Sequence, residues 1–254
     1  MAVSFWVLSV LLVSGCSGVP TAFAPPVAVD ISKGRRSIGV ISMLGATFSM
    51  QKVGVTVFSN EYKSAPIASW GIDDVVNTKI ANLLAGDVDV KRISYPKDAF
   101  AAYEAPGGLF RDHSAEFKDG LRKVTAGQKC DLYLAVVAGG SAFGSSNQFV
   151  KGIGIVQGSS VFVNQMWIHA LFQMRLYDGR TLELLGWKPA TLGQSTFMAV
   201  IRGPNREVEA SFWPQTERVE TDGRLRTAVR ELVEQGVAAT LPEVLTLGRA
   251  VRAD

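Results

Sequence analysis

The chain has 254 residues, of which 47% are hydrophobic and 19% are charged. That length can bury a sizeable core in one large domain or two small ones, and the composition excludes a disordered chain and a polytopic membrane protein. The formal net charge is only +3 and the basic residues form no dense run, so we expect no binding of nucleic acid.

The chain begins with an apolar segment over residues 2–13. It is too short to cross a bilayer, which needs about 20 residues, and it has the length of the apolar part of a signal peptide. The segment ends in Val13-Ser14-Gly15-Cys16, where an aliphatic and two small residues precede a cysteine. This pattern resembles the lipobox of bacterial lipoproteins. The resemblance implies removal of residues 1–15 and attachment of lipid to Cys16, which would anchor the chain on a membrane.

The leader departs from the usual signal peptide in one respect. The α-amino group of Met1 supplies the only positive charge before the apolar segment. A buried N-terminal helix with an incidental cysteine is therefore the alternative. Ser17 follows Cys16, and by resemblance to Gram-negative lipoproteins a residue other than Asp at that place favours the periplasmic face of the outer membrane.

Residues 16–36 are predicted to form a flexible linker, because Pro20, Pro25 and Pro26 stand among small residues. One globular domain is expected over residues 37–245. Its first elements are a strand at 38–43 and a hairpin at 48–57 that turns at Gln51-Lys52.

Strands and helices then alternate along the chain. A helix is predicted over 69–85, with Ser69 as a possible N-cap and with Asp73 and Asp74 where the helix dipole favours acidic groups. A strand at 88–93, a helix at 114–125 and a strand at 132–137 come next. The last strand is apolar throughout, which indicates burial on both faces.

The second half of the domain is richer in strands. A flexible loop is expected at 139–147, then a strand from Ile153 and a long alternating run over 161–177. Asp178-Gly179 is a strong turn signal that leads into a return strand at 182–187. A last helix is predicted over 222–236, and Pro242 should interrupt the chain beyond that helix. The fold class is therefore α/β with α+β character: a mixed sheet with flanking helices, a long hairpin and a C-terminal helix.

This order of elements resembles a group of bacterial lipoproteins. The group contains the curli-secretion lipoprotein, the activator lipoproteins of penicillin-binding proteins and the N-terminal domain of the Tol-system propeller protein. The resemblance rests on the helix and strand over 72–93, the strand at 131–137 and the hairpin at 174–186; the Thr-Gly of the group's hairpin is absent, because Leu182 follows Thr181. It implies a role in partner binding or assembly and supplies no catalytic residue.

Ser141 is the one candidate nucleophile that the sequence offers. It follows a buried strand in the sequence Gly139-Gly140-Ser141-Ala142-Phe143. A nucleophile elbow needs Gly two residues after the serine, and Phe143 stands there instead. We therefore expect a surface loop, with an envelope serine hydrolase using Ser141 as the alternative.

The remaining chemistry-bearing residues are few. His113 and His169 show no metal-ligand spacing, the carboxylate pair Asp73-Asp74 fits a helix start, and no dinucleotide or P-loop motif occurs. We expect no metal and no cofactor. Cys130 precedes a strand and is predicted to be a small buried hydrophobe.

A partner surface is predicted on the less apolar side of the run over 161–177. Trp167, His169, Leu171 and Tyr177 alternate onto that side, and exposed aromatic groups on a strand face suggest contact. The alternative is that the C-terminal helix covers this side. The sequence thus predicts a lipid-anchored, non-catalytic module that binds an envelope protein, with a small-ligand-binding periplasmic domain as a further alternative.

Overall fold

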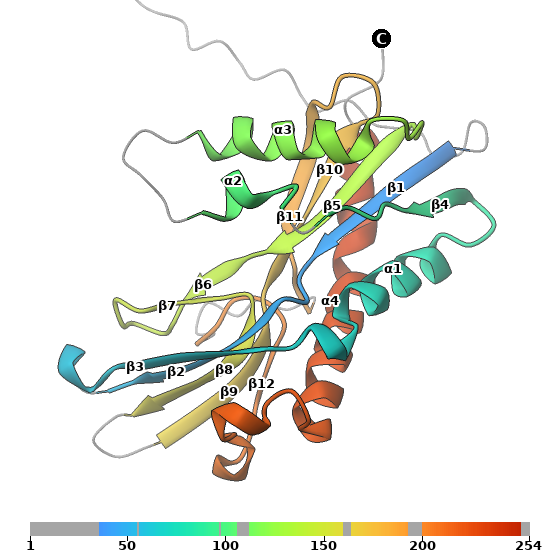
Figure 1. Ribbon diagram of the computed structural model, residues 1–254. Helices are drawn as coiled ribbons and strands as arrows, with labels where there is room; N and C mark the ends of the chain where they lie inside the picture. Colours follow the sequence, from blue (N-terminus) through green and yellow to red (C-terminus); the bar gives the residue numbers. More distant parts are fainter. Residues whose placement is uncertain are drawn as a thin grey trace, which may run out of the picture.

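The computed structural model describes residues 36–54, 56–96, 98–105, 112–159, 164–192 and 200–249. The predicted leader, Cys16 and most of the linker lie outside the described residues. The described chain forms two five-stranded mixed sheets, one above the other in Figure 1, with helices on both faces of the upper sheet. The predicted α/β class with mixed strand pairing, flanking helices and a C-terminal helix is confirmed, although the strands form two large sheets where one was predicted.

The upper sheet, called sheet A, has the strand order β11-β10-β5-β1-β4. Strand β1 pairs in parallel with both β4 and β5, whereas β10 runs antiparallel to β5 and β11. As its apolar sequence predicts, β5 is buried on both faces. The strands are β1 (Arg36–Met43), β4 (Val88–Arg92), β5 (Leu132–Ala138), β10 (Phe172–Asp178) and β11 (Leu184–Pro189).

Helices cover the two faces of sheet A, as Figure 1 shows. On one side lie α1 (Ile72–Leu83) and α4 (Gly223–Arg249), and on the other α2 (Ala101–Glu104) and α3 (His113–Thr125). The helix over 114–125 is confirmed. The helix over 69–85 is shorter than predicted: Ser69 lies in a 3-10 turn, and Gly71 is the N-cap of α1.

The lower sheet, called sheet B, has the order β12-β9-β8-β2-β3. Its strands are β2 (Thr47–Val53), β3 (Glu61–Pro66), β8 (Ile153–Ser159), β9 (Asn164–Ala170) and β12 (Asn205–Glu207). The predicted turn at Gln51-Lys52 is wrong, because β2 runs on to Val53 and the chain turns back before β3. The loop expected at 139–147 holds β6 (Gly140–Ala142), which pairs with β7 (Phe149–Lys151).

The chain passes between the two sheets at a junction made by Gly139, Gly152 and Leu171. Three backbone hydrogen bonds join them: the N–H of Gly139 donates to the carbonyl of Leu171 (3.0 Å), that of Leu171 to Gly152 (2.8 Å), and that of Gly152 to Gly139 (2.9 Å). This ring satisfies backbone groups that neither sheet pairs. It also fixes how the sheets sit on each other.

The junction corrects the prediction of one long hairpin arm over 161–177. Strand β9 ends at Ala170 in sheet B, and β10 begins at Phe172 in sheet A. Leu171 interrupts the strand because its N–H donates to the carbonyl of Gly152 and its carbonyl accepts from the N–H of Gly139, so neither group pairs with a neighbouring strand. The turn at Asp178-Gly179 is confirmed, since β10 and β11 form an antiparallel hairpin there.

Helix α4 is longer than predicted, and Pro242 lies inside it. Val237, Leu241 and Val244 are buried, so the apolar stripe continues past the expected end at 236. In Figure 1 the helix runs beside both sheets, and it packs on β9, β10, β11 and α1. Burial of this stripe outweighs the one backbone hydrogen bond that Pro242 cannot donate.

Candidate functional site

The candidate site lies where β1 and β5 reach their carboxyl ends. From β1 the chain runs through β2 and β3 of sheet B and then α1 to β4, which lies on one side of β1. It continues through α2 and α3 to β5, which lies on the other side of β1. The strand order therefore reverses at β1. Ligands of open α/β sheets bind in the crevice outside the carboxyl ends of strands at such a point.

A cavity of about 790 Å³ occupies this place. We call it the inner cavity. It lies between the ends of β1 and β5, the start of sheet B and helix α2. Its lining includes Leu44, Thr47, Tyr103, Glu104, His113, Ala138, Lys151 and Arg175.

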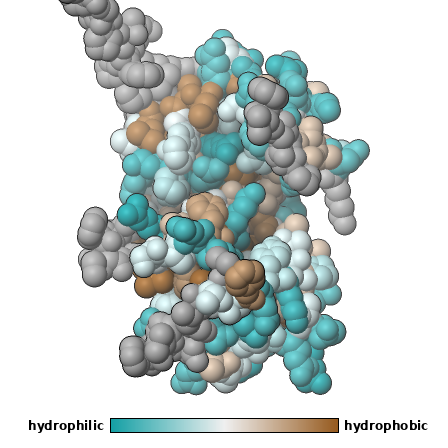
Figure 2. All heavy atoms as spheres, turned by 90° about the vertical axis from the view of Figure 1, so that its left-hand side faces the viewer, coloured by the Kyte–Doolittle hydropathy of each residue, from teal (hydrophilic) through white to brown (hydrophobic). Residues whose placement is uncertain are grey.

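A second cavity of about 430 Å³ lies between α3 and the outer face of β10 and β11. We call it the outer cavity. Its lining includes His113, Lys118, Gln173, Arg175, Tyr177, Glu183, Leu184 and Trp187. His113 and Arg175 line both cavities, so the two meet at these side chains. Figure 2 looks at this side of the molecule and shows a hollow at mid-height with apolar surface in its depth.

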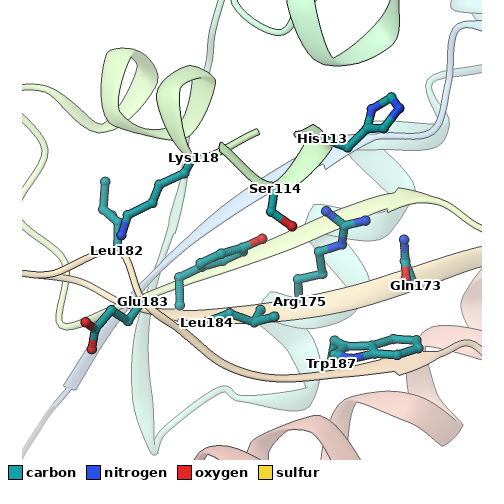
Figure 3. Close-up of a pocket in the computed structure, with 10 residues that line it drawn as sticks. His113, Ser114, Lys118, Gln173, Arg175, Leu182, Glu183, Leu184 and Trp187 are labelled. Carbon is teal, nitrogen blue, oxygen red and sulfur yellow. The ribbon is translucent and has the colours of Figure 1, made fainter. Parts of the chain in front are cut away.

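Arg175 stands at the centre of the site. It projects from β10 toward the start of α3, where His113 and Ser114 lie (Figure 3). Its guanidinium carbon is 5.0 Å from the ring centroid of Phe117 and 5.7 Å from that of Tyr103, and Nη2 donates to the Tyr103 hydroxyl at 3.3 Å. Aromatic faces attract a guanidinium, so the two rings hold the cation in place.

The charge of Arg175 lacks a carboxylate partner in the part of the chain that the structure describes. Among the described residues no carboxylate forms an ion pair with it. Glu104 and Glu183 line the cavities but make no such contact. Half-buried charges are usually paired. An arginine has five N–H donors, and its hydrogen bonds with the Tyr103 and Tyr177 hydroxyls leave others available toward the cavities.

Neighbouring groups set the polarity of the site. Burial raises the pKa of Tyr177, and the charge of Arg175 opposes this rise, so the phenol stays protonated at neutral pH. Burial also raises the pKa of Glu104, which Lys151 opposes. His113 Nδ1 lies 3.8 Å from a carboxylate oxygen of Glu116.

An apolar rim borders the outer cavity on β11. Leu184 is 49% exposed and Trp187 is 52% exposed. In Figure 3 Trp187 lies along β11 below Arg175 and Gln173. Strand β11 is an edge of sheet A, because β10 is its only partner among the described strands. The described helices leave this outer face of β11 open.

The partner surface predicted from the sequence differs from the open face of β11. Trp167, His169, Leu171 and Tyr177 are all buried, with exposed fractions of 8%, 1%, 3% and 6%. Trp167 and Leu171 belong to a core cluster with Phe143, whereas Tyr177 stacks on Phe117 on the other side of the junction. The prediction of one exposed face was wrong because the chain changes sheets at Leu171.

His169 fills the junction instead of a polar surface. Its Nδ1 lies 3.0 Å from the carbonyl oxygen of Gly152, and its Nε2 has no hydrogen-bond partner among the described residues. Burial lowers the pKa of His169 to about 4, so the ring is neutral at physiological pH.

Ser141 is buried in β6. Its Oγ donates to the carbonyl of Ala142 (2.7 Å) and accepts the N–H of Arg202 (2.9 Å). Cys130 is a free buried cysteine, and burial raises its pKa, which confirms the prediction of a small buried hydrophobe. Within the described residues no group of three or more His, Cys, Asp or Glu side chains is placed to hold a metal ion.

Arg175 was not among the site residues predicted from the sequence. Alternation along 172–178 places Gln173, Arg175 and Tyr177 on one side of the strand, and that was its only signal. The contacts that define the site come from Tyr103 and Phe117, which are far away in the sequence.

No family model matches the sequence, and no curated protein matches it. Solved structures with a similar arrangement include a protein of family DUF330 from Xanthomonas campestris, with 10% identity, a TM-score of 0.36 and 91% of each chain covered. Lipoprotein GNA1162 of Neisseria meningitidis has 12% identity and a TM-score of 0.28, covering 79% of this chain and 96% of its own. PelC of Paraburkholderia phytofirmans has 10% identity and a TM-score of 0.29, covering 86% and 90%. These scores assign neither a family nor a function.

The described helices were compared with the length and hydropathy that a membrane-spanning helix needs. None of them is both long and apolar enough to cross a bilayer.

Proposed function

We propose that this chain is a lipid-anchored protein of the bacterial envelope whose folded domain binds another envelope protein. The observation that carries the anchor is the apolar segment that ends in Val13-Ser14-Gly15-Cys16. A thiol at this place accepts diacylglycerol, and two or more acyl chains hold a protein stably on a membrane. Ser17 supports placement at the outer membrane.

The open face of β11 supports the binding role. Leu184 and Trp187 expose apolar surface beside the outer cavity. They lie on β11, which pairs with β10 on one side and with no described strand on the other. Exposed apolar surface next to polar groups is typical of protein contact sites, and an edge strand offers unpaired backbone groups to an extended segment. This face replaces the one predicted at Trp167 and Leu171.

We propose further that the domain acts by binding and not by catalysis. Both hydrogen bonds of the Ser141 hydroxyl hold it inside β6, away from the inner cavity, whose lining does not include it. An activity-based serine probe tests this on the purified chain. A covalent adduct that Ser141→Ala abolishes would establish the hydrolase alternative.

Fractionation tests the anchor. The wild-type chain is expected in the membrane fraction and in the detergent phase of a two-phase extraction, and Cys16→Ala in the aqueous phase with the folded domain intact. Equal partition of the two proteins would contradict a lipid anchor.

Cross-linking in intact cells tests the binding role. A photoreactive amino acid in place of Leu184 or Gln173 should capture one protein reproducibly. A matched control places it at Leu83, an exposed leucine of α1 on the opposite side of sheet A, and should not capture that protein. Absence of any cross-link from both test positions would contradict binding at this face.

A further inference from the structure

The site described above holds a cation that no carboxylate of the described residues pairs with. Arg175 is fixed by Phe117 and Tyr103 and lies where the inner and outer cavities meet. Its planar fork of N–H donors matches the geometry of a carboxylate and binds one with two parallel hydrogen bonds. Burial among aromatic rings lowers the local dielectric constant, which strengthens such a bond.

The groups around Arg175 favour an anion. Lys118 extends from α3 over the outer cavity, as Figure 3 shows, and Lys151 lines the inner cavity. Glu183 lies at the far end of the outer cavity near Leu182, and Glu104 lies near Lys151, whose charge stabilises its ionised form. Across the two linings Arg175, Lys118 and Lys151 stand against Glu104 and Glu183, and Arg175 is the cation where the cavities meet.

The apolar rim gives a second requirement. Trp187 and Leu184 lie on β11 beside the outer cavity and are half exposed. A ligand that places an anion on Arg175 has apolar surface next to it, along a strand with an open edge. An extended polypeptide with an acidic residue next to apolar residues meets both requirements, because it can lie along an edge strand with alternate side chains turned inward.

We propose that the outer cavity and its apolar rim on β11 bind an acidic segment of a partner protein, with Arg175 holding one Asp or Glu carboxylate of that segment. The proposal rests on the proposed function and names the chemistry of its site. Arg175 sets the specificity of the contact, and Trp187 and Leu184 bury the adjoining apolar side chains.

The test uses the full chain in intact cells, with the photoreactive amino acid in place of Leu184. Arg175→Gln should lower the yield of the cross-linked partner about tenfold or more, because a hydrogen-bonded charge pair is lost. Arg175→Lys keeps the charge without the fork and should retain part of the yield. Arg226→Gln removes an exposed arginine of α4 and serves as the matched control, with no change expected. Thermal unfolding midpoints check that each variant is folded.

Mass spectrometry of the cross-linked peptide identifies the bound segment. It should contain an Asp or Glu close to the cross-linked residue, and exchanging charges, with Arg175→Glu in this chain and that acid replaced by Arg in the partner, should restore the yield. A cross-link that is insensitive to Arg175→Gln, or a segment without an acidic residue, would overturn this inference and leave the proposed function standing. No cross-link at all would contradict both. A small anion retained by the purified chain in native mass spectra and lost in Arg175→Gln would overturn the polypeptide as the ligand.

Discussion

At the scale of single residues, His169 shows how the fold changes a side chain's chemistry. A neutral ring places Nδ1–H on the Gly152 carbonyl and leaves Nε2 as an acceptor without a partner among the described residues. Protonation would add a buried charge and an Nε2–H donor that has no acceptor among the described residues. Burial therefore holds the pKa near 4, below its ordinary value of 6.5.

This shift predicts loss of stability in acid. Between about pH 6.5 and pH 4, His169 is protonated in the unfolded chain but neutral in the folded chain. The free energy of unfolding therefore falls as the pH drops through that window. The full effect is about 3 kcal/mol at most. Urea unfolding at pH 7 and pH 4.5 measures it. His169→Gln should show a smaller drop between the two pH values than the wild type, and an equal drop would contradict the assignment.

At the scale of elements, sheet B depends on a close approach of strands β2, β8 and β9 at Gly154. Gly154 of β8 pairs with Ser49 of β2 and His169 of β9. A Cβ at Gly154 would lie 2.5 Å from the carbonyl oxygen of Ser49, which cannot move without shifting β2. Gly154→Ala should therefore lower the free energy of unfolding by about 2 kcal/mol.

The control for that change is Gly223→Ala. A Cβ at Gly223, the first residue of α4, meets nothing within 4 Å. Its effect should stay within about 0.5 kcal/mol. Denaturant titration of both variants decides the matter: equal effects would show that β8 tolerates a side chain at residue 154.

Helix α4 gives a second prediction at this scale. Leu241 is 1% exposed and belongs to the core cluster that α4 shares with both sheets. Leu241→Ala should cost about 2 to 5 kcal/mol, because it leaves a cavity in that core. Leu184→Ala removes the same atoms from an exposed site and should cost much less. Similar unfolding free energies for the two variants would contradict the packing described for α4.

Those elements that a local pattern defines could be predicted from the sequence. The apolar strand β5 and the one-sided helix α3 carry their own signals, and both were found. The break at Leu171 could not be predicted, because alternation continues through it and only hydrogen bonds to Gly139 and Gly152 interrupt the strand. The extension of α4 past Pro242 was missed because tertiary burial overrides a local penalty.

The candidate site was less predictable than the fold. Arg175 lies on the polar side of an alternating strand, as many surface residues do. Its importance depends on Tyr103 and Phe117, which helices α2 and α3 bring to it. Trp167 and Leu171 carried the stronger sequence signal and are core residues.

At the scale of the whole molecule, helix α4 packs on both sheets and the junction joins them. Strand β1 begins in the upper part of Figure 1, at the end of sheet A away from sheet B, and leads down to β2 of sheet B. Residues 1–35 precede it in the chain. The outer cavity at Arg175 lies on β10 and β11 of sheet A, beneath α3.

Mass spectrometry of the mature N-terminus tests most directly whether Cys16 carries lipid. We predict that the chain purified from membranes begins at Cys16 and carries the added mass of a diacylglycerol and an acyl group. Cys16→Ala should lack this mass and keep the leader. A wild-type peptide that runs from Gly15 into an unmodified Cys16 would contradict the claim.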